Sequence, residues 1–426
     1  MIGHHSSLGC AKLLRRLALI ALASFSGGFA IDLAHAADTI KICIIDDATG
    51  DFAIPQIPRT HGFQLAVDEI NKNGGVLGKQ LQLVIYDGQS DVKRFQELAL
   101  KCTLDDKVAV MFAGYTSSER EAARAIAVKN KTIFWHNNQG EGGIAEKYSF
   151  FTGPVPEQQV LPGVEYMIKK FGKKVYMLHP DYGFGHVNAV WMHVATAQFG
   201  GEVVGEEYIP LGNTDFAATI GNIQKAKPDW IAMSLVGANQ QQYYPQAYAA
   251  GIRIPMFSTV NLQQGYEHKR FPPPQLANMF VATEYQEELP KESAKAFRTL
   301  FRSKFPNEPY VNELARCAWV GIHLMAEAWT RAGTTETEAT ISALQSGISF
   351  DAPEGRVFLD PATHHLTMPM YLARVTETHD LDWVADFGEG EPWWLRAVGV
   401  NLVRHDDNKQ YLPWDYPRFE KFVGKR

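Results

Sequence analysis

Apolar and polar positions alternate along the chain in a pattern that predicts a parallel α/β fold. The run from Ile40 to Ile45 is apolar and rich in β-branched residues, which is typical of a buried strand. A loop with Pro55 and Pro58 is expected next. From Thr60 to Asn73 apolar residues recur at helical spacing before a glycine pair, which predicts a helix. A βαβαβ order is completed by strands at 81–86 and 108–112 and a helix at 93–102.

A second series of similar size follows the first. We expect helices at 118–128, 159–171, 187–199, 216–226 and 240–250, and strands at 132–135, 174–178, 202–208, 230–235 and 279–283. Helices are expected at 294–305, 312–332 and 337–345, and strands at 356–359, 370–375 and 383–387. The chain beyond these shows no clear periodicity. The pattern predicts two doubly wound lobes with a ligand cleft at the carboxyl ends of their strands.

The first 36 residues differ in kind from the rest. Lys12, Arg15 and Arg16 precede an apolar run from Leu17 to Phe25, and Ala34-His35-Ala36 follows. This order predicts a secretory signal cleaved after Ala36 and export to the periplasm. The apolar run is shorter than the ~20 residues that span a bilayer.

Composition and motifs exclude several classes of protein. The chain has 426 residues, 46% of them apolar, and a net charge of −6, so it is neither disordered nor built for nucleic acid. The sequence has no phosphate loop, dinucleotide-binding fingerprint, G-x-S-x-G elbow or H-E-x-x-H motif. We therefore expect no enzyme activity, no cofactor and no metal.

Cysteine usage fits an exported protein without a disulfide framework. Removal of the signal leaves Cys43, Cys102 and Cys317, each in an apolar context. An odd number leaves at least one thiol unpaired, and we expect buried free thiols.

One segment that follows a predicted strand carries small hydroxyl residues. Ala113 to Arg120 ends a strand and opens a helix, and Ser117 or Ser118 is expected to cap that helix. Hydroxyls and free N–H groups at such a position suit a carbonyl or carboxylate oxygen of a ligand.

Several spaced motifs resemble those of type I periplasmic binding proteins, the solute receptors of branched-chain amino acid and amide transporters. They are Ile70 to Lys79, Phe151 to Gln159, Tyr208 to Gly212, Leu235 to Gly237 and Asp351 to Gly355. The last four are similar to the urea and short-chain-amide receptors in particular. The resemblance implies two lobes joined by three hinge crossovers, near 153–156, 283–290 and 351–355. The first lobe would hold 37–153 and 287–352, and the second 154–286 and 353–426.

The resemblance also implies a site and partners. Tyr115 and Ser117 match ligand-contacting residues of the first lobe, Tyr182 matches the aromatic lid of the second, and Gly237, Ala238 and Asn239 match a further contact. The receptor would capture a small-molecule solute and deliver it to an inner-membrane ABC permease with its ATPase subunits.

The chain departs from the pattern in two places. The loop after the fourth strand reads Trp135-His136-Asn137-Asn138-Gln139-Gly140-Glu141, of which only Glu141-Gly142 fits the amide receptors. Amino acid receptors place a glutamate within Ser258 to Gln263, where this chain has no acid. A buried ammonium without a carboxylate is costly, which argues against an amino acid unless Glu141 or Glu267 substitutes. The predicted ligand-binding residues are Tyr115, Ser117, Ser118, Trp135, His136, Asn138, Glu141, Tyr182, Gly237, Ala238 and Asn239.

The ligand and the output of binding both stay open on the sequence. A short amide or urea-like solute ranks slightly above an amino acid. The alternative to transport is a sensory subunit that signals to a membrane kinase or chemoreceptor.

Overall fold

The computed structural model describes residues 39–416. The expected export signal lies outside this range. Five parallel strands form the first sheet, in the order β2 (Leu81–Asp87), β1 (Ile40–Asp46), β3 (Val110–Ala113), β4 (Ile133–His136) and β6 (Ser149–Phe151). Side chains of β1 alternate between two cores, because Ile42 and Ile44 face one layer of helices while Cys43 and Ile45 face the other.

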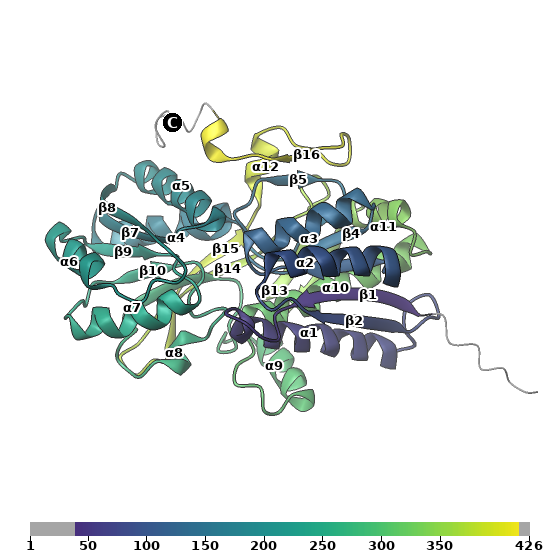
Figure 1. Ribbon diagram of the computed structural model, residues 1–426, viewed down its shortest axis with the longest axis horizontal. Helices are drawn as coiled ribbons and strands as arrows, with labels where there is room; N and C mark the ends of the chain where they lie inside the picture. The colour runs from purple at the N-terminus through teal and green to yellow at the C-terminus, as the bar shows by residue number, and fades with distance from the viewer. Residues whose placement is uncertain (1–38, 417–426) are drawn as a thin grey trace, which may run out of the picture. The chain divides into compact units, whose positions relative to one another are not determined.

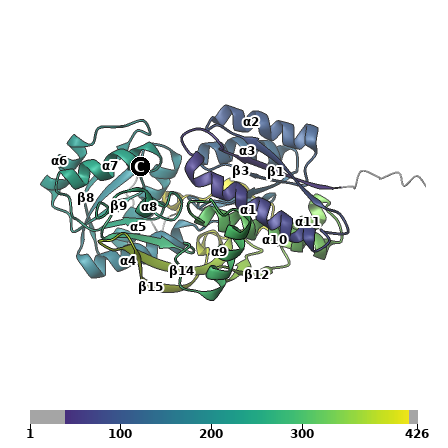
Figure 2. The same cartoon turned by 90° about the horizontal axis from the view of Figure 1, so that it is seen from below.

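Two helical layers cover the first sheet (Figure 2). The helices α1 (Ala53–Lys72) and α10 (Glu313–Ala332) pack together on one face, and α11 (Thr337–Leu344) lies beside them. The other face carries α2 (Val92–Leu100), the π-helix η1 (Lys101–Asp106) and α3 (Ser117–Lys129). The layers confirm the α/β prediction for this part of the chain.

Nine strands form the second sheet. Its order is β12 (Ile348–Ala352), β13 (Gly355–Leu359), β14 (Leu366–Val375), β11 (Met279–Thr283), β10 (Met256–Ser258), β9 (Trp230–Met233), β7 (Lys174–Pro180) and β8 (Glu202–Ile209), and β15 (Leu381–Gly390) pairs with β14. One face packs on α4 (Pro156–Phe171) and α5 (Gly183–Gln198), the other on α6 (Ala217–Ala226) and α7 (Ala238–Ala249). The short α8 (Glu267–Arg270) follows β10, and α9 (Glu292–Lys304) follows β11.

Strand β14 passes from one core to the next. Its first half buries Leu366, Met368 and Met370 with the apolar residues of the first sheet, while Leu372 and Ala373 belong to the cores of the second. The chain therefore runs between these cores along β14. Residues 351–355, near which a crossover is predicted, form the tight hairpin between β12 and β13.

Helix α1 begins seven residues earlier than predicted, at Ala53 instead of Thr60. The prolines misled the prediction, because Pro55 and Pro58 both lie in the first two turns of the helix. Proline is tolerated in a first turn, where N–H groups have no helical partner, which accounts for Pro55, whereas Pro58 lies inside the helix and removes one helical hydrogen bond. The carbonyl of Pro55 accepts a hydrogen bond from Asn312 Nδ2 at 2.8 Å.

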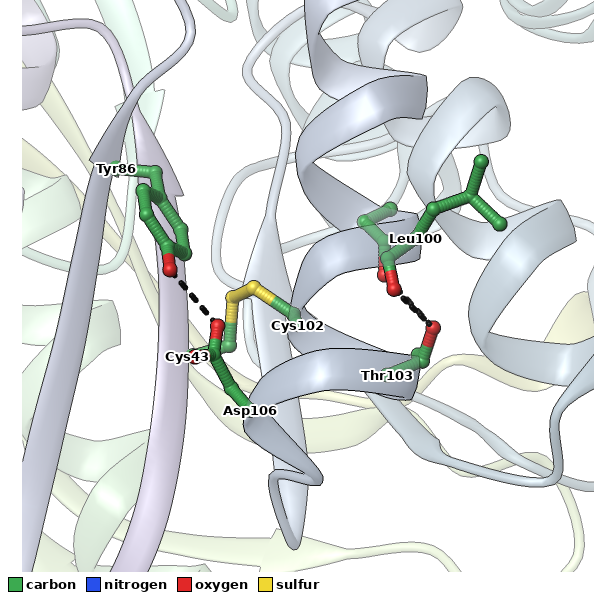
Figure 3. Close-up of a disulfide and its surroundings, with 7 residues drawn as sticks. Cys43, Tyr86, Leu100, Cys102, Thr103 and Asp106 are labelled. Carbon is green, nitrogen blue, oxygen red and sulfur yellow. Dashed lines mark hydrogen bonds between the residues drawn. A yellow bond between two sulfur atoms is a disulfide. The ribbon is translucent and has the colours of Figure 1, made fainter.

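Cys43 and Cys102 form a disulfide, so the expectation of free thiols was wrong for this pair (Figure 3). Cys43 lies on β1 and Cys102 on η1, with their Cα atoms 6.0 Å apart. Close by, Tyr86 donates a hydrogen bond to Asp106 at 2.8 Å. Both cysteines lie in one apolar core, and burial alone does not reveal which cysteines face each other. Cys317 is buried and free, as predicted.

The segment after β15, for which no helix or strand was predicted, folds against the rest of the chain. It contains α12 (Trp393–Ala397), β16 (Asn408–Gln410) and the 3-10 helix η2 (Pro413–Asp415). Strand β16 pairs antiparallel with the short β5 (Ile144–Glu146), which lies between β4 and β6 in sequence. Within residues 39–416, no helix combines the length and the apolar character that crossing a membrane requires.

Candidate functional site

The turn between β3 and α3 forms one wall of the site. Thr116, rather than Ser117 or Ser118 as expected, caps α3: its side chain accepts from the N–H of Glu119 at 3.3 Å. The carboxylate of Glu119 accepts in return from the N–H groups of Thr116 and Tyr115, at 2.8 and 3.0 Å. Burial, followed by the nearby Asp47, raises the pKa of Glu119 to about 7. With Thr116 as the cap, the hydroxyl of Ser117 is left for another partner.

A cavity of about 290 Å³, part of it open to solvent, lies beside this turn. Residues from both sheets line it, and each follows the carboxyl end of a parallel strand, where α/β folds bind ligands. From the first sheet come Tyr115, Ser117, Arg120, Asn138, Gln139 and Glu141, and from the second Tyr182, Phe184, Val236, Val260 and Gln264.

A buried ion pair dominates the electrostatics of the cavity. Arg120 Nη1 donates to Glu141 Oε2 at 2.6 Å, and both side chains are 3% exposed. Ser117 donates to the other oxygen of Glu141. Burial disfavours the charged form of Arg120, but the carboxylates of Glu141 and Glu121 outweigh it and raise the pKa of Arg120. Arg120 therefore keeps its positive charge, with the carboxylates of Glu141 and Glu121 as its partners in the wall of the cavity.

Amide side chains join the two sheets at the cavity. Tyr115 donates its hydroxyl proton to Gln264 Oε1, and Gln264 Nε2 donates to Asn138 Oδ1, each at 2.7 Å. Asn138 Nδ2 donates to the carbonyl of Tyr115 at 2.9 Å, which closes the ring of bonds. A second bridge runs from Gln263 Nε2 to Gln139 Oε1 at 3.1 Å. These bonds fix the polar groups that face the cavity.

Aromatic and aliphatic side chains supply the apolar wall. Tyr182 and Phe184, at the start of α5, cluster with Tyr115, Val236 and Val260. Burial raises the pKa of Tyr182 well above its ordinary value, so its hydroxyl stays protonated as a donor. Such rings exclude water from a ligand while ordering few rotatable bonds.

Five of the eleven predicted residues line the cavity: Tyr115, Ser117, Asn138, Glu141 and Tyr182. Gly237 lines a neighbouring space of about 360 Å³ that shares Tyr115, Val260 and Gln264 with the first. Ala238 lines neither space, and Ser118 is exposed.

The other three predicted residues have structural contacts instead. Trp135 is buried between Phe112 and Phe150, with ring centroids 5.9 and 5.3 Å away. His136 Nδ1 lies 3.3 Å from the carbonyl oxygen of Ala113, and burial lowers the pKa of His136 well below its ordinary value. The side-chain amide of Asn239 holds the loop after β8 by donating to the carbonyls of Pro210, Leu211 and Asn213.

Six cavity residues are not among the eleven predicted ones: Arg120, Gln139, Phe184, Val236, Val260 and Gln264. A signal existed for Arg120, because it lies three positions after Ser117 and hence on the same face of α3. Val260 and Gln264 follow β10, a strand of three residues that the apolar pattern did not reveal.

A second polar cluster does not line the cavity, although one of its members, Glu313, interacts with the lining residue Gln264. Atoms of Glu284, Glu313 and Cys317 that could bind a cation lie within 4.8 Å of one another. The guanidinium of Arg316 is 3.7 Å from Glu284, so a positive charge already neighbours the carboxylates. Burial and the adjacent Glu284 raise the pKa of Glu313 well above its ordinary value. This cluster is suited to hold Arg316 and a proton.

Comparison with known proteins agrees with this geometry. The profile of a family described as periplasmic binding protein matches residues 39–380. Leu/Ile/Val-binding protein homolog 6 of Brucella melitensis is 23% identical over 378 residues, which span 86% of this chain and 94% of that protein. The leucine-, isoleucine-, valine-, threonine-, and alanine-binding protein of Pseudomonas aeruginosa is 24% identical over 356 residues, 83% of this chain and 92% of that protein.

Solved structures share the fold at low sequence identity. An ABC transporter solute binding protein from Rhodopseudomonas palustris HaA2, in complex with p-hydroxybenzoic acid, has a TM-score of 0.75 at 21% identity and covers 84% of this chain and 100% of its own. The branched-chain amino acid transporter substrate binding protein LivJ from Streptococcus pneumoniae, in complex with isoleucine, has a TM-score of 0.69 at 23% identity, covering 81% and 99%. None of these four is named for urea or an amide, so that specificity stays a prediction. The chain belongs to the periplasmic binding protein family, the solute-binding receptors that work with ABC transporters, and is not an enzyme.

Proposed function

We propose that the cavity binds a short amide or urea-like solute, which the receptor delivers to an inner-membrane ABC permease and its ATPase subunits. The observation that carries the proposal is the charge balance of the lining. Among the described lining residues only Arg120 and Glu141 are charged, and they pair with each other at 2.6 Å. A solute with a net charge would need a partner of its own in this buried setting, whereas a neutral solute does not.

The hydrogen-bonding groups of the lining suit both the N–H groups and the carbonyl oxygen of an amide. The Glu141 carboxylate accepts hydrogen bonds, and an amide or urea N–H group would add one. The amide groups of Asn138, Gln139 and Gln264 each carry two N–H donors and so offer donors for a carbonyl oxygen, while the Ser117 hydroxyl, which donates to Glu141, can accept from an N–H group. The rings of Tyr182 and Phe184 would cover the remaining face.

An amino acid is the second candidate, and the position of Glu141 favours it. The sequence lacks an acid at 258–263, beside the nine-stranded sheet, to pair with an α-ammonium. The buried carboxylate of Glu141 lines the cavity from the side of the five-stranded sheet and could take that role. The relatives named for leucine, isoleucine and valine point the same way. An ammonium at Glu141 would compete with Arg120 for the same carboxylate.

A thermal-shift screen tests the proposal. The chain from residue 37 is unfolded and refolded to remove carried-over solute, then heated with acetamide, urea, L-leucine or 4-hydroxybenzoate. A ligand at 100 times its Kd adds about 2.7 kcal/mol to the folded state and raises the melting temperature. We expect a rise with acetamide or urea. A rise with L-leucine alone would select the amino acid, and a rise with 4-hydroxybenzoate alone would refute the charge-balance argument.

Substitutions locate the binding. Ser117→Ala and Tyr182→Ala should each weaken solute binding about tenfold or more, because each removes one contact, while the melting temperature without solute stays nearly unchanged. Ser118→Ala is the matched control, since Ser118 is the next residue in the sequence and its hydroxyl is exposed and outside the cavity. Unaltered affinity in both variants would show that the solute binds elsewhere.

A further inference from the structure

The segment from Glu391 to Tyr416, here called the strap, lies beyond the part of the chain that the family profile matches. Its first end packs on the helices of the nine-stranded sheet. Trp394 is fully buried, its ring centroid lies 5.4 Å from that of Trp191 on α5, and its backbone N–H donates to Glu157 on α4 at 3.1 Å. These contacts anchor the strap to α4 and α5.

The middle of the strap packs on the side of the five-stranded sheet. Leu395, Val400 and Leu402 form a small apolar cluster with Ala145 of β5. The carbonyl of Leu402 accepts a hydrogen bond from Gln345 Nε2 at 2.9 Å, just after α11. The strap therefore contacts helices and loops that belong with both sheets.

The far end of the strap holds the loop that carries Glu141. Strand β16 pairs with β5, beside which it lies in Figure 1. The N–H of Tyr411 donates to the carbonyl of Gly143 at 2.7 Å, and Gln410 Nε2 donates to the carbonyl of Gly142 at 3.2 Å. Both glycines directly follow Glu141 in the sequence.

The strap lies so close to Gly143 that a side chain at this position would not fit. A Cβ placed on Gly143 would lie 2.1 Å from the carbonyl oxygen of Tyr411, and φ of Gly143 is +76°. That same carbonyl accepts from Trp394 Nε1 at 2.7 Å, which joins the two ends of the strap. The anchor on α5 and the contact with the Glu141 loop thus form one hydrogen-bonded unit.

We propose that the strap is a fourth connection between the lobes and that it holds Glu141 in place in the cavity, so that Gln410 and Tyr411 are positioning residues for solute binding. The part about Glu141 rests on the proposed function of the cavity. Glu141 has few ways to move while Gly142 and Gly143 are bonded to the strap. Release of the strap would let the loop rearrange and the Arg120 pair loosen.

The experiment compares Tyr411→Pro with Tyr411→Ala. Both variants remove the ring, but only proline removes the N–H that bonds Gly143, so the difference reports the loss of that hydrogen bond together with the fixed φ of proline. Hydrogen–deuterium exchange is measured in the protein without solute. We expect the amides of residues 140–146 to exchange about tenfold faster in Tyr411→Pro than in Tyr411→Ala. Equal rates would overturn the proposal.

Affinity measurements test whether the effect passes through Glu141. With acetamide, urea or L-leucine as the probe, Tyr411→Pro should bind about tenfold more weakly than Tyr411→Ala. In a Glu141→Gln background the same comparison should give less than a twofold difference, because residues that act through one group are not additive. An unchanged tenfold loss in that background would overturn the positioning role.

A second pair of variants covers the case in which Tyr411→Pro does not fold. Gly143→Ala pushes on the strap at Tyr411, while Gly200→Ala has nearly the same φ, +74°, with nothing within 4 Å of the added carbon. Faster exchange at residues 140–146 in the first variant alone supports the strap, and equal exchange in both refutes it. If none of the three probes binds wild-type protein, the proposed function fails, while the exchange rates still decide on the strap.

Discussion

The buried side chain of Glu157 predicts how the stability of the protein changes with pH. It lies in the first turn of α4 and is 7% exposed. One carboxylate oxygen accepts from the N–H of Trp394 at 3.1 Å, and within residues 39–416 the other has no hydrogen-bond partner. Burial raises the pKa of Glu157 to about 7, although backbone N–H groups of Glu157 and Trp394 lower it in part.

A raised pKa means that the folded protein binds this proton more tightly than the unfolded chain does. The stabilising contribution is therefore complete below the unfolded value and is lost as the pH rises through about 7. Against an ordinary glutamate pKa of about 4.5, this group lowers the free energy of unfolding by about 2.5 kcal/mol between pH 5 and pH 8.

Glu157→Gln removes the titration but keeps an oxygen that accepts from Trp394. The variant should match wild type at pH 5 and be more stable by about 2.5 kcal/mol at pH 8. With an unfolding entropy of about 2.1 cal/mol/K per residue over about 390 residues, this corresponds to a melting temperature about 3 °C higher. Thermal unfolding of both proteins from pH 5 to pH 8 measures the difference.

The comparison cancels the titration of other groups. Glu119, whose pKa is also raised to about 7, and the buried histidines contribute equally to both proteins. Glu165→Gln is the matched control, because Glu165 lies on the same helix but is partly exposed and pairs with Lys169. A difference between Glu157→Gln and wild type that stays constant from pH 5 to pH 8 would refute the reasoning.

Three further predictions concern the disulfide, the cavity and the buried cluster. Removal of the Cys43–Cys102 bond, which joins residues 59 positions apart, should lower the free energy of unfolding by about 4 kcal/mol and the melting temperature by about 5 °C. Alkylation of the denatured, unreduced chain from residue 37 should label one thiol, and three labels would contradict the bond. Asn138→Ala should change the ranking of solutes in the thermal-shift screen, whereas a uniform loss across solutes would contradict a selectivity role. Glu354→Ala should cost about 3 to 5 kcal/mol in denaturant unfolding, because Glu354 pairs with the fully buried Arg316; a cost below 1 kcal/mol would contradict it.

The regular elements were predictable because their apolar patterns are long. Strand β1 shows seven residues with both faces buried, and α10 shows twenty residues with an apolar stripe. The elements that the pattern missed are short, such as β5, β10 and β16 with three residues each. At that length periodicity carries almost no information, and tertiary contacts decide the structure.

The site was predictable only as far as the strand ends were. Ser117, Asn138 and Glu141 lie beyond the ends of β3 and β4, where side chains reach the cleft. Trp135 and His136 are the last two residues of β4 itself, and both side chains are buried: Trp135 packs in the apolar core, and His136 lies against the carbonyl of Ala113 and the ring of Phe151. The distinction depends on where the strand ends, within one or two residues, and sequence patterns do not resolve strand ends that finely.

Glu157 also links the lead prediction to the strap and the cavity. A Cβ on Gly142 would lie 3.5 Å from Glu157 Oε2, so this carboxyl lies beside the loop that carries Glu141 as well as accepting from Trp394. Ionisation of Glu157 at about neutral pH therefore places a buried negative charge between the anchor of the strap and the charged pair of the cavity. The balance of charge on which the proposed neutral solute depends therefore extends beyond the lining residues to Glu157, which lies on α4 between the loop of Glu141 and the anchor of the strap.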